Sequence, residues 1–78
     1  MNELKRIRIF DKGISQFKLS RASGVHPSRL SLIENSVTTP TMNEIKRISD
    51  ALGIVGEEIF GLDLVVRRLT AGRRRETE

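Results

Sequence analysis

Glycines that follow stretches of helical periodicity are the feature that most limits the fold of this chain. Gly13, Gly24 and Gly53 each come directly after a segment whose apolar residues recur at helical spacing. Glycine is the residue that most often ends a helix. The sequence therefore predicts an all-α protein made of short helices, and no strand pair, internal repeat or second domain is visible.

Five helices are expected from the start and stop residues. They are residues 2–12, a short helix capped by Ser15, residues 27–35 with Pro27 at the first helical position, a helix capped by Thr41, and a last helix at residues 57–60. Thr41 and Glu44 have the spacing of a capping box. The residues expected to face inward are Leu4, Ile7, Phe10, Leu19, Ala22, Leu30, Ile33, Ile45, Ile48 and Leu52.

The size of the chain sets a limit on its stability. With 78 residues it has room for one domain, and a domain this small buries only about 60% of the surface that its unfolded chain exposes. The sequence contains no cysteine, so neither a disulfide nor a Cys/His zinc site can stabilise it. We therefore expect compact helix packing together with formation of a homodimer.

Positive charge is concentrated at the two ends of the chain. The net charge is +4, yet residues 13–66 hold five basic and six acidic residues. This balance is compatible with nucleic acid, an anionic membrane surface or an acidic partner. Neither end has the basic amphipathic helix with aromatic anchors that binds membranes. Charges among the first ten residues interrupt any signal peptide or membrane span, so a cytoplasmic location without membrane attachment is expected.

Two segments follow the helical body, which is expected to span residues 1–61. Residues 62–69 are apolar and ambiguous, because their pattern fits both a helical stripe and the alternation of a strand. They are the expected dimerisation segment, and pairing through Phe60 and its neighbours is the alternative. Residues 70–78 are short, polar and rich in arginine, which predicts a flexible basic tail.

The two short helices on either side of Gly24 have the arrangement of a helix-turn-helix, whose second helix enters the major groove of DNA. From Leu4 to Phe60 the sequence resembles the helix-turn-helix domain of phage repressors and Cro proteins. The matching residues are Leu4, Ile7, Arg8, Ile14, Ser15, Gln16, Leu19, Gly24, Val25, Leu30, Ile33, Glu34, Asn35, Pro40, Ala51, Leu52, Gly53, Ile54, Glu58, Ile59 and Phe60. The resemblance implies a compact five-helix, lambda-repressor-like bundle in which Arg8 pairs with Glu34.

Helical geometry separates the two faces of the expected DNA-reading helix. With Leu30 and Ile33 inward, the opposite face turns outward, and Arg29 flanks it within reach of a guanine edge or a phosphate. The resemblance places Gln16 and Ser28 where family members touch phosphate or bases. The predicted DNA-contacting residues are Gln16, Lys18, His26, Pro27, Ser28, Arg29, Ser31, Leu32, Asn35, Thr38 and Thr39.

The predicted surface departs from the family pattern in three places. Leu32 stands where relatives often carry a polar base reader, and it either packs on a thymine methyl or is an ordinary surface leucine. His26 and Pro27 replace Ser or Thr followed by a polar residue, which weakens the expected helix cap by ~0.5 to 1 kcal/mol. The loop 36–39 lacks the lysine or arginine of its relatives, so weak binding to non-specific DNA is expected.

These patterns predict a sequence-specific transcriptional regulator, a repressor that binds double-stranded DNA as a dimer on a palindromic operator. A regulatory protein partner, concentration or proteolysis would have to relieve the repression. The alternative is a protein-interaction module of the same fold, such as an antitoxin or an anti-repressor partner, that docks through residues 62–69. No catalytic residue, cofactor or metal is expected, because the chain has no phosphate-binding glycine loop, no nucleophile motif and a single histidine.

Overall fold

The computed structural model describes residues 2–67, and this part of the chain consists of helices and turns without a strand. The helices are α1 (Leu4–Arg6), η1 (Ile7–Asp11), α2 (Gln16–Ser23), α3 (Pro27–Glu34), α4 (Met42–Leu52) and α5 (Gly56–Phe60). Because η1 continues α1 directly, the body has five consecutive helices, and the predicted all-helical fold class is confirmed. The predicted basic tail, residues 70–78, lies outside the described residues.

The first helix widens in its second half. The backbone N–H of Lys12 donates to the carbonyl of Ile7 at 3.0 Å, five residues back, which is the π-helical pattern. Phe10 is 79% exposed, so the expectation that it faces inward is wrong. Even in a regular helix Phe10 lies roughly a quarter turn from the face that Leu4 and Ile7 define. The buried position beside them belongs to Arg8.

The predicted helix starts are confirmed at α2 and α4. The hydroxyl of Ser15 accepts a hydrogen bond from the backbone N–H of Lys18 at 3.0 Å. Thr41 and Glu44 form the complete capping box, with 3.1 Å from the Glu44 N–H to the Thr41 hydroxyl and 2.8 Å from the Thr41 N–H to the Glu44 carboxylate. Both caps satisfy backbone donors that have no partner inside the helix.

One hydrophobic core joins all the helices. It consists of Leu4, Ile7, Leu19, Val25, Leu30, Ile33, Ile45, Ile48, Leu52, Ile59, Phe60 and Val65. Ala22 was expected here and is exposed, which corrects that prediction. The second inward residue on α2, beside Leu19, is instead Ser23. Its hydroxyl accepts a hydrogen bond from the backbone N–H of Val25 at 3.2 Å and so has a partner in its buried position.

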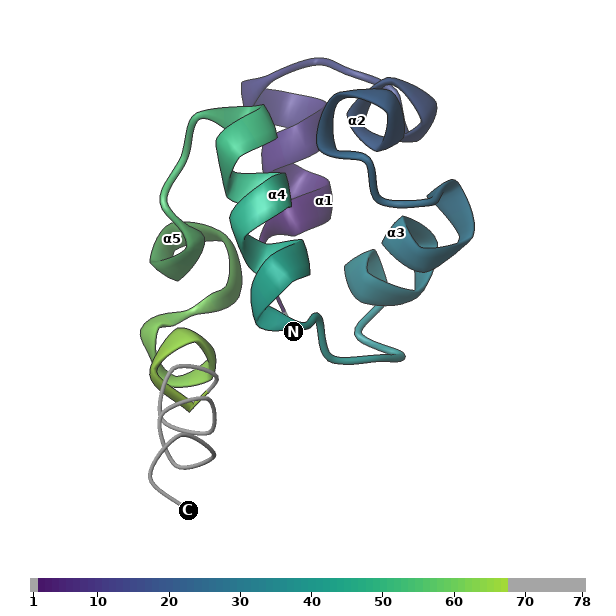
Figure 1. Ribbon diagram of the computed structural model, residues 1–78. Coiled ribbons are helices and arrows are strands. Elements are labelled where there is room, and N and C mark those ends of the chain that lie inside the picture. The colour runs from purple at the N-terminus through teal and green to yellow at the C-terminus, as the bar shows by residue number, and fades with distance from the viewer. Residues whose placement is uncertain (1, 68–78) are drawn as a thin grey trace.

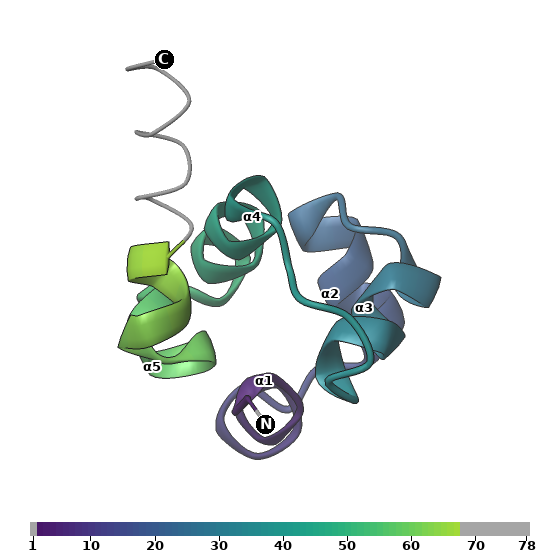
Figure 2. The ribbon, with the colours of Figure 1, turned by 90° about the horizontal axis from the view of Figure 1, so that it is seen from below.

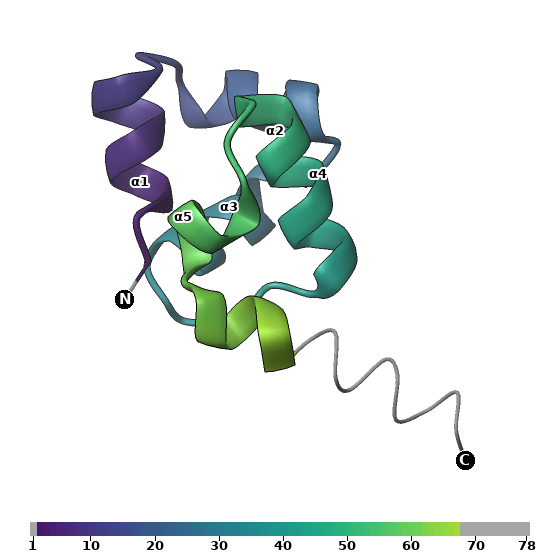
Figure 3. The same ribbon diagram turned by 90° about the vertical axis from the view of Figure 1, so that its left-hand side faces the viewer.

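The helices divide into two sides around α4. Figure 1 shows α2 and α3 on one side of α4 and α5 on the other, and Figure 2, seen from below, shows all of them arranged around a common interior. Figure 3 shows that α5 and residues 62–67 cover the side facing away from α2 and α3. The outer faces of α2 and α3 are therefore not covered by the rest of the described chain.

Residues 62–67 are helical, which decides between the two alternatives for this part of the ambiguous segment. Val65 is 6% exposed and belongs to the core, whereas Leu62 and Val66 are 62% and 48% exposed. This short helix thus packs one side on the body and exposes Leu62 and Val66 outward, next to the exposed charged residues Asp63 and Arg67. The last two positions of the 62–69 segment are not among the described residues.

Candidate nucleic-acid interface

A three-residue turn, residues 24–26, sets the direction of α3 relative to α2. Gly24 ends α2 in the left-handed region, at φ 77°, where a side chain would be strained. Val25 follows at 5% exposure and anchors the turn in the core. The sequence prediction of a glycine-centred helix-turn-helix is therefore confirmed in its geometry.

The outer face of α3 carries the predicted reading residues. Leu30, Ile33 and Glu34 are its buried residues. Ser28 and Asn35 are exposed and Ser31 is half-buried. Leu32 is 42% exposed, so part of this apolar side chain faces water. The face therefore offers small hydroxyl groups and one aliphatic group, and no charged side chain lies among these outward residues.

His26 occupies the N-cap position of α3. Its Nδ1 accepts a hydrogen bond from the backbone N–H of Ser28 at 3.1 Å, so the imidazole itself caps the start of α3. Pro27 stands at the first helical position, where a missing N–H leaves no bond unmade. His26 is exposed, and the cap uses its Nδ1 and not its Nε2.

A buried ion pair positions Gln16 at the start of α2. The Nε of Arg8 donates to Glu34 at 2.6 Å, and the two side chains are 9% and 2% exposed. Arg8 also donates to the carbonyl of Ile14 at 3.0 Å. The amide nitrogen of Gln16 donates to the same Glu34 carboxylate at 3.2 Å. An amide nitrogen carries two hydrogens, so Gln16 keeps one donor for a phosphate.

Arg29 differs most from its sequence interpretation. Its Nε and Nη2 donate to the two carboxylate oxygens of Glu44 on α4, at 2.6 and 2.9 Å. Its Nη1 donates to the hydroxyl of Thr38 at 3.1 Å, and its Nη2 donates to the carbonyl of Thr39 at 3.3 Å. The hydrogen bond from Arg29 lowers the pKa of Glu44, and the same bond raises the pKa of Arg29. The guanidinium is thus held within the protein instead of projecting toward a base.

The loop between α3 and α4 contains the remaining predicted residues. Thr38 is half-buried and Thr39 is exposed, while Val37 between α3 and these threonines is 70% exposed. Backbone N–H groups of Val37 and Thr38 donate to the carbonyl of Leu32 at 2.9 and 3.4 Å, which folds the first half of the loop back on α3. The loop therefore lies beside the reading face and carries hydroxyl groups but no cation.

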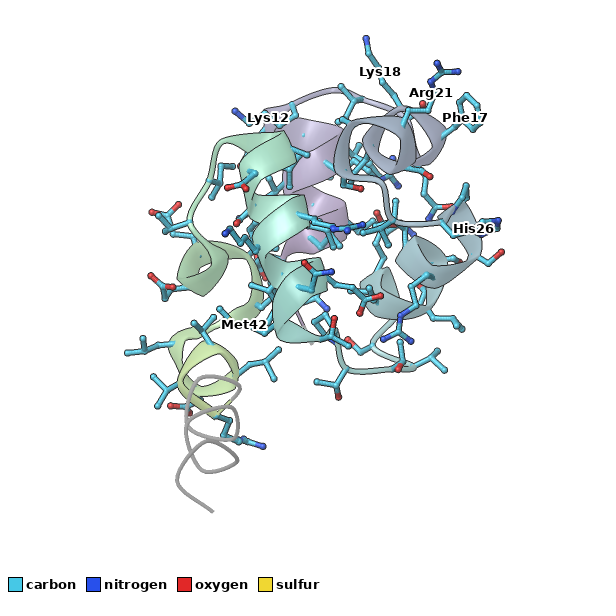
Figure 4. All side chains as sticks on the ribbon, viewed as in Figure 1. Lys12, Phe17, Lys18, Arg21, His26 and Met42 are labelled. Atoms are coloured by element: carbon cyan, nitrogen blue, oxygen red, sulfur yellow. The ribbon has the colours of Figure 1, made fainter. Side chains whose placement is uncertain are left out.

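Two exposed residues of α2 were not among the predicted contacts. Phe17 is 62% exposed, and the guanidinium of Arg21 lies over its ring at 5.9 Å from the centroid. Figure 4 shows Phe17, Lys18 and Arg21 projecting outward from α2, with His26 on the same side of the molecule and away from residues 62–67. The helical period places Phe17 and Arg21 together one turn apart, a signal that could have identified the pair.

The structure brings part of the predicted set together: Lys18 and His26 project on the same side of the molecule (Figure 4), whereas the guanidinium of Arg29 is held by Glu44, Thr38 and Thr39. Gln16 and Lys18 start α2, His26 and Pro27 start α3, and the loop 36–39 lies at the other end of α3. A helix-turn-helix family model matches residues 4–60. The chain belongs to the helix-turn-helix family. No curated protein and no solved structure matches it.

Membership of the helix-turn-helix family confirms the resemblance to phage repressors and Cro proteins. It identifies the chain as a DNA-binding domain of transcriptional regulators, a family of regulatory domains rather than of enzymes. Within residues 2–67, no helix is long and apolar enough to cross a bilayer. The same residues contain no group of three or more potential ligands placed to hold a metal ion.

Proposed function

We propose that this protein is a cytoplasmic repressor that binds a palindromic operator as a homodimer, with α3 in the major groove. The observation that carries the proposal is the uncovered outer face of α3, where Ser28 and Leu32 are exposed between a capped N-terminus and the adjacent loop. In helix-turn-helix proteins the second helix lies in the major groove and the first crosses the DNA backbone. An exposed outer face of α3, with α2 beside it, fits this arrangement.

The proposed contacts divide into base contacts and phosphate contacts. Ser28 and Ser31 offer hydroxyls to base edges, and Leu32 packs on the methyl group of a thymine. Asn35 is a weaker candidate, because its side-chain nitrogen already donates to the carbonyl of Ser31 at 2.9 Å.

The phosphate contacts come from five residues, Gln16, Lys18, His26, Thr38 and Thr39. The second amide hydrogen of Gln16, the free cation of Lys18, the imidazole of His26 and the threonines of the loop each donate to the backbone. Pro27 contributes by contact and by starting α3. Few of these groups are charged, and each neutralised phosphate adds about −0.9 to the slope of log K against log salt. Binding is therefore expected to be only modestly salt-dependent for a protein of this family.

Dimer formation through the outward face of residues 62–67 supplies a second α3, which binds the second half-site of the operator. Leu62 and Val66 are exposed, and they belong to the segment that lies with α5 on the side facing away from α2 and α3 (Figure 3). Isolated apolar residues on a surface are common, but two on one face of a short helix suit a self-complementary contact around a two-fold axis. A dimer doubles the number of contacts, which offsets the small number of charges in each subunit.

Selection from a random duplex library at two salt concentrations tests this function. The expected result is a palindromic consensus whose half-sites are separated by roughly 10 base pairs, one helical turn. The consensus should persist at the higher salt, because base contacts rather than charge carry the discrimination. Absence of any enriched sequence at either salt would reject the proposal and favour a protein-interaction module of the same fold.

A further inference from the structure

Arg29 links three parts of the interface through one guanidinium. Four hydrogen bonds join it to Glu44, Thr38 and Thr39. A guanidinium has five N–H donors, so most of its donor capacity is used inside the protein. The side chains of Arg29 and Glu44 are 32% and 17% exposed, which leaves the pair at the edge of the interface rather than in the core.

Glu44 has two roles in the same geometry. One of its oxygens accepts both the backbone N–H of Thr41, at 2.8 Å, and the Nη2 of Arg29, at 2.9 Å. The carboxylate therefore caps the start of α4 and holds the side chain of a residue on α3. Through this shared oxygen, the position of α3 is connected to the point where the loop enters α4.

The second half of the loop depends on this connection. The first half folds back on α3 by backbone hydrogen bonds to Leu32. Ser36 adopts a left-handed conformation at φ 58°, which is uncommon for a residue with a side chain. Arg29 then holds Thr38 by its hydroxyl and Thr39 by its carbonyl.

The bond to Thr38 determines how that hydroxyl can bind a ligand. A hydroxyl has one hydrogen to donate and two lone pairs to accept with. The Thr38 oxygen already accepts from the Nη1 of Arg29, so its hydrogen remains to be donated. A hydroxyl that accepts from a cation is polarised and becomes a better donor. An anionic oxygen, such as one of a DNA phosphate, is the matching acceptor.

We propose that Arg29 is a positioning residue that, together with Glu44, fixes the loop and directs the Thr38 hydroxyl toward a DNA phosphate, instead of reading a base itself. This inference rests on the proposed function, since it assigns roles within the same DNA-binding surface. It also accounts for a loop without lysine or arginine, because the cation behind the hydroxyl comes from α3.

The direction in which one substitution changes DNA affinity distinguishes this role from direct DNA contact by Arg29. Glu44→Gln keeps the size of the side chain and an oxygen that can accept from the Thr41 N–H, but it removes the charge that holds Arg29. Asp50→Asn is the matched control, because it removes one negative charge from an exposed position on the same helix. Affinity for the selected duplex is compared between the two variants by fluorescence anisotropy, and thermal melting verifies that both are folded.

The proposal predicts that the Glu44→Gln variant binds about tenfold more weakly than the Asp50→Asn variant, the effect of losing one charge-assisted hydrogen bond. If Arg29 contacts DNA directly, releasing it from Glu44 strengthens binding. Affinity of Glu44→Gln equal to or above that of the control would overturn the proposal.

Two further readouts distinguish positioning from general stabilisation. Arg29→Lys should lower affinity while leaving the selected consensus unchanged at every base pair, and a changed base preference would overturn the proposal.

Thr38→Val removes the hydroxyl and keeps the shape of the side chain. Its effect on affinity should largely disappear in the Arg29→Lys background, because both act through the same phosphate contact. Fully additive effects would contradict that pathway.

Failure of this inference and failure of the proposed function give different results in these experiments. If the wild-type protein selects no duplex, the proposed function fails before any variant is compared. If it selects a duplex and the variants behave as independent contacts, only the role of Arg29 and Glu44 is rejected.

Discussion

The role of a single side chain in this protein depends more on the residues that it contacts than on its position along a helix. Arg29 and Arg8 are both arginines on helices, yet one holds a loop and the other is buried against Glu34. Helical periodicity gives the direction of a side chain but not the acceptor that it meets. The resemblance to phage repressors supplied the Arg8 partner, and no local pattern indicated that Arg29 would bind Glu44 fifteen residues away.

Leu32 provides a test of base reading at the scale of one methyl group. Replacing the contacted thymine by deoxyuridine removes only the methyl from the duplex. Wild-type affinity should fall about fourfold, the value of roughly 0.8 kcal/mol for one buried carbon group. The Leu32→Ala variant should bind both duplexes equally in the same anisotropy assay. Equal binding of both duplexes by the wild type would show that Leu32 does not contact the thymine methyl group and is an ordinary surface residue.

The buried pair of Arg8 and Glu34 should be far more important for stability than the exposed pair of Arg6 and Glu3. Arg8→Ala leaves a 2% exposed carboxylate without its ion partner, so the free energy of unfolding should fall by about 3 to 5 kcal/mol. Urea denaturation monitored by circular dichroism measures this loss. Arg6→Ala is the control, since its side chain is 53% exposed and should change the midpoint little. Similar midpoints for both variants would refute the structural role of Arg8.

At the scale of helices, the sequence was most informative about where each one begins and ends. Ser15 and Thr41 form the predicted caps, because side-chain oxygen chemistry at a helix start is local. The directions predicted for Phe10 and Ala22 were wrong, since Phe10 lies at the edge of the face that Leu4 and Ile7 define, and Ser23 rather than Ala22 meets the core on α2. Those outcomes depend on packing between helices, which a single sequence encodes only weakly.

The approach of α5 to α4 leaves no space for a side chain at Gly56. A Cβ atom built there would lie 2.8 Å from the Cγ2 of Ile45, a residue that is 2% exposed. Gly56→Ala should therefore lower the free energy of unfolding by about 1 to 3 kcal/mol through overpacking. In an Ile45→Ala background, where that methyl is absent, the additional cost of Gly56→Ala should largely vanish. An equal cost in both backgrounds, measured by urea denaturation, would show that the close contact is not the cause.

At the scale of the whole molecule, the two sides of the bundle have separate proposed tasks. The side formed by α2 and α3 carries the proposed DNA contacts, and α5 and residues 62–67, which lie across α4 from it, include the exposed Leu62 and Val66 proposed for dimerisation. The sequence indicated both segments, but their placement on opposite sides of α4 follows only from the packed structure. Because residues 62–67 lie away from α3, a dimer can form through them without covering the outer face of α3.

Dimerisation should be removable without changing the reading surface. A double variant, Leu62→Ser with Val66→Ser, keeps the net charge and replaces two exposed apolar side chains. Sedimentation equilibrium should show a concentration-dependent dimer for the wild type and a monomer for this variant. Its affinity should fall for a duplex with two half-sites and stay the same for a single half-site. Val55→Ser, at another exposed position, should remain dimeric, and a dimeric double variant would exclude this face as the interface.

The position of DNA on the protein is the central claim, and an amide chemical-shift titration with the selected duplex measures it most directly. At 8.8 kDa the protein is small enough for every described amide to be followed. The largest shifts should fall at residues 16–18, 26–32 and 36–39, while residues 55–60 shift little. Shifts concentrated at residues 55–67, with α3 unaffected, would contradict the claim that α3 and its adjacent loop form the DNA-binding surface.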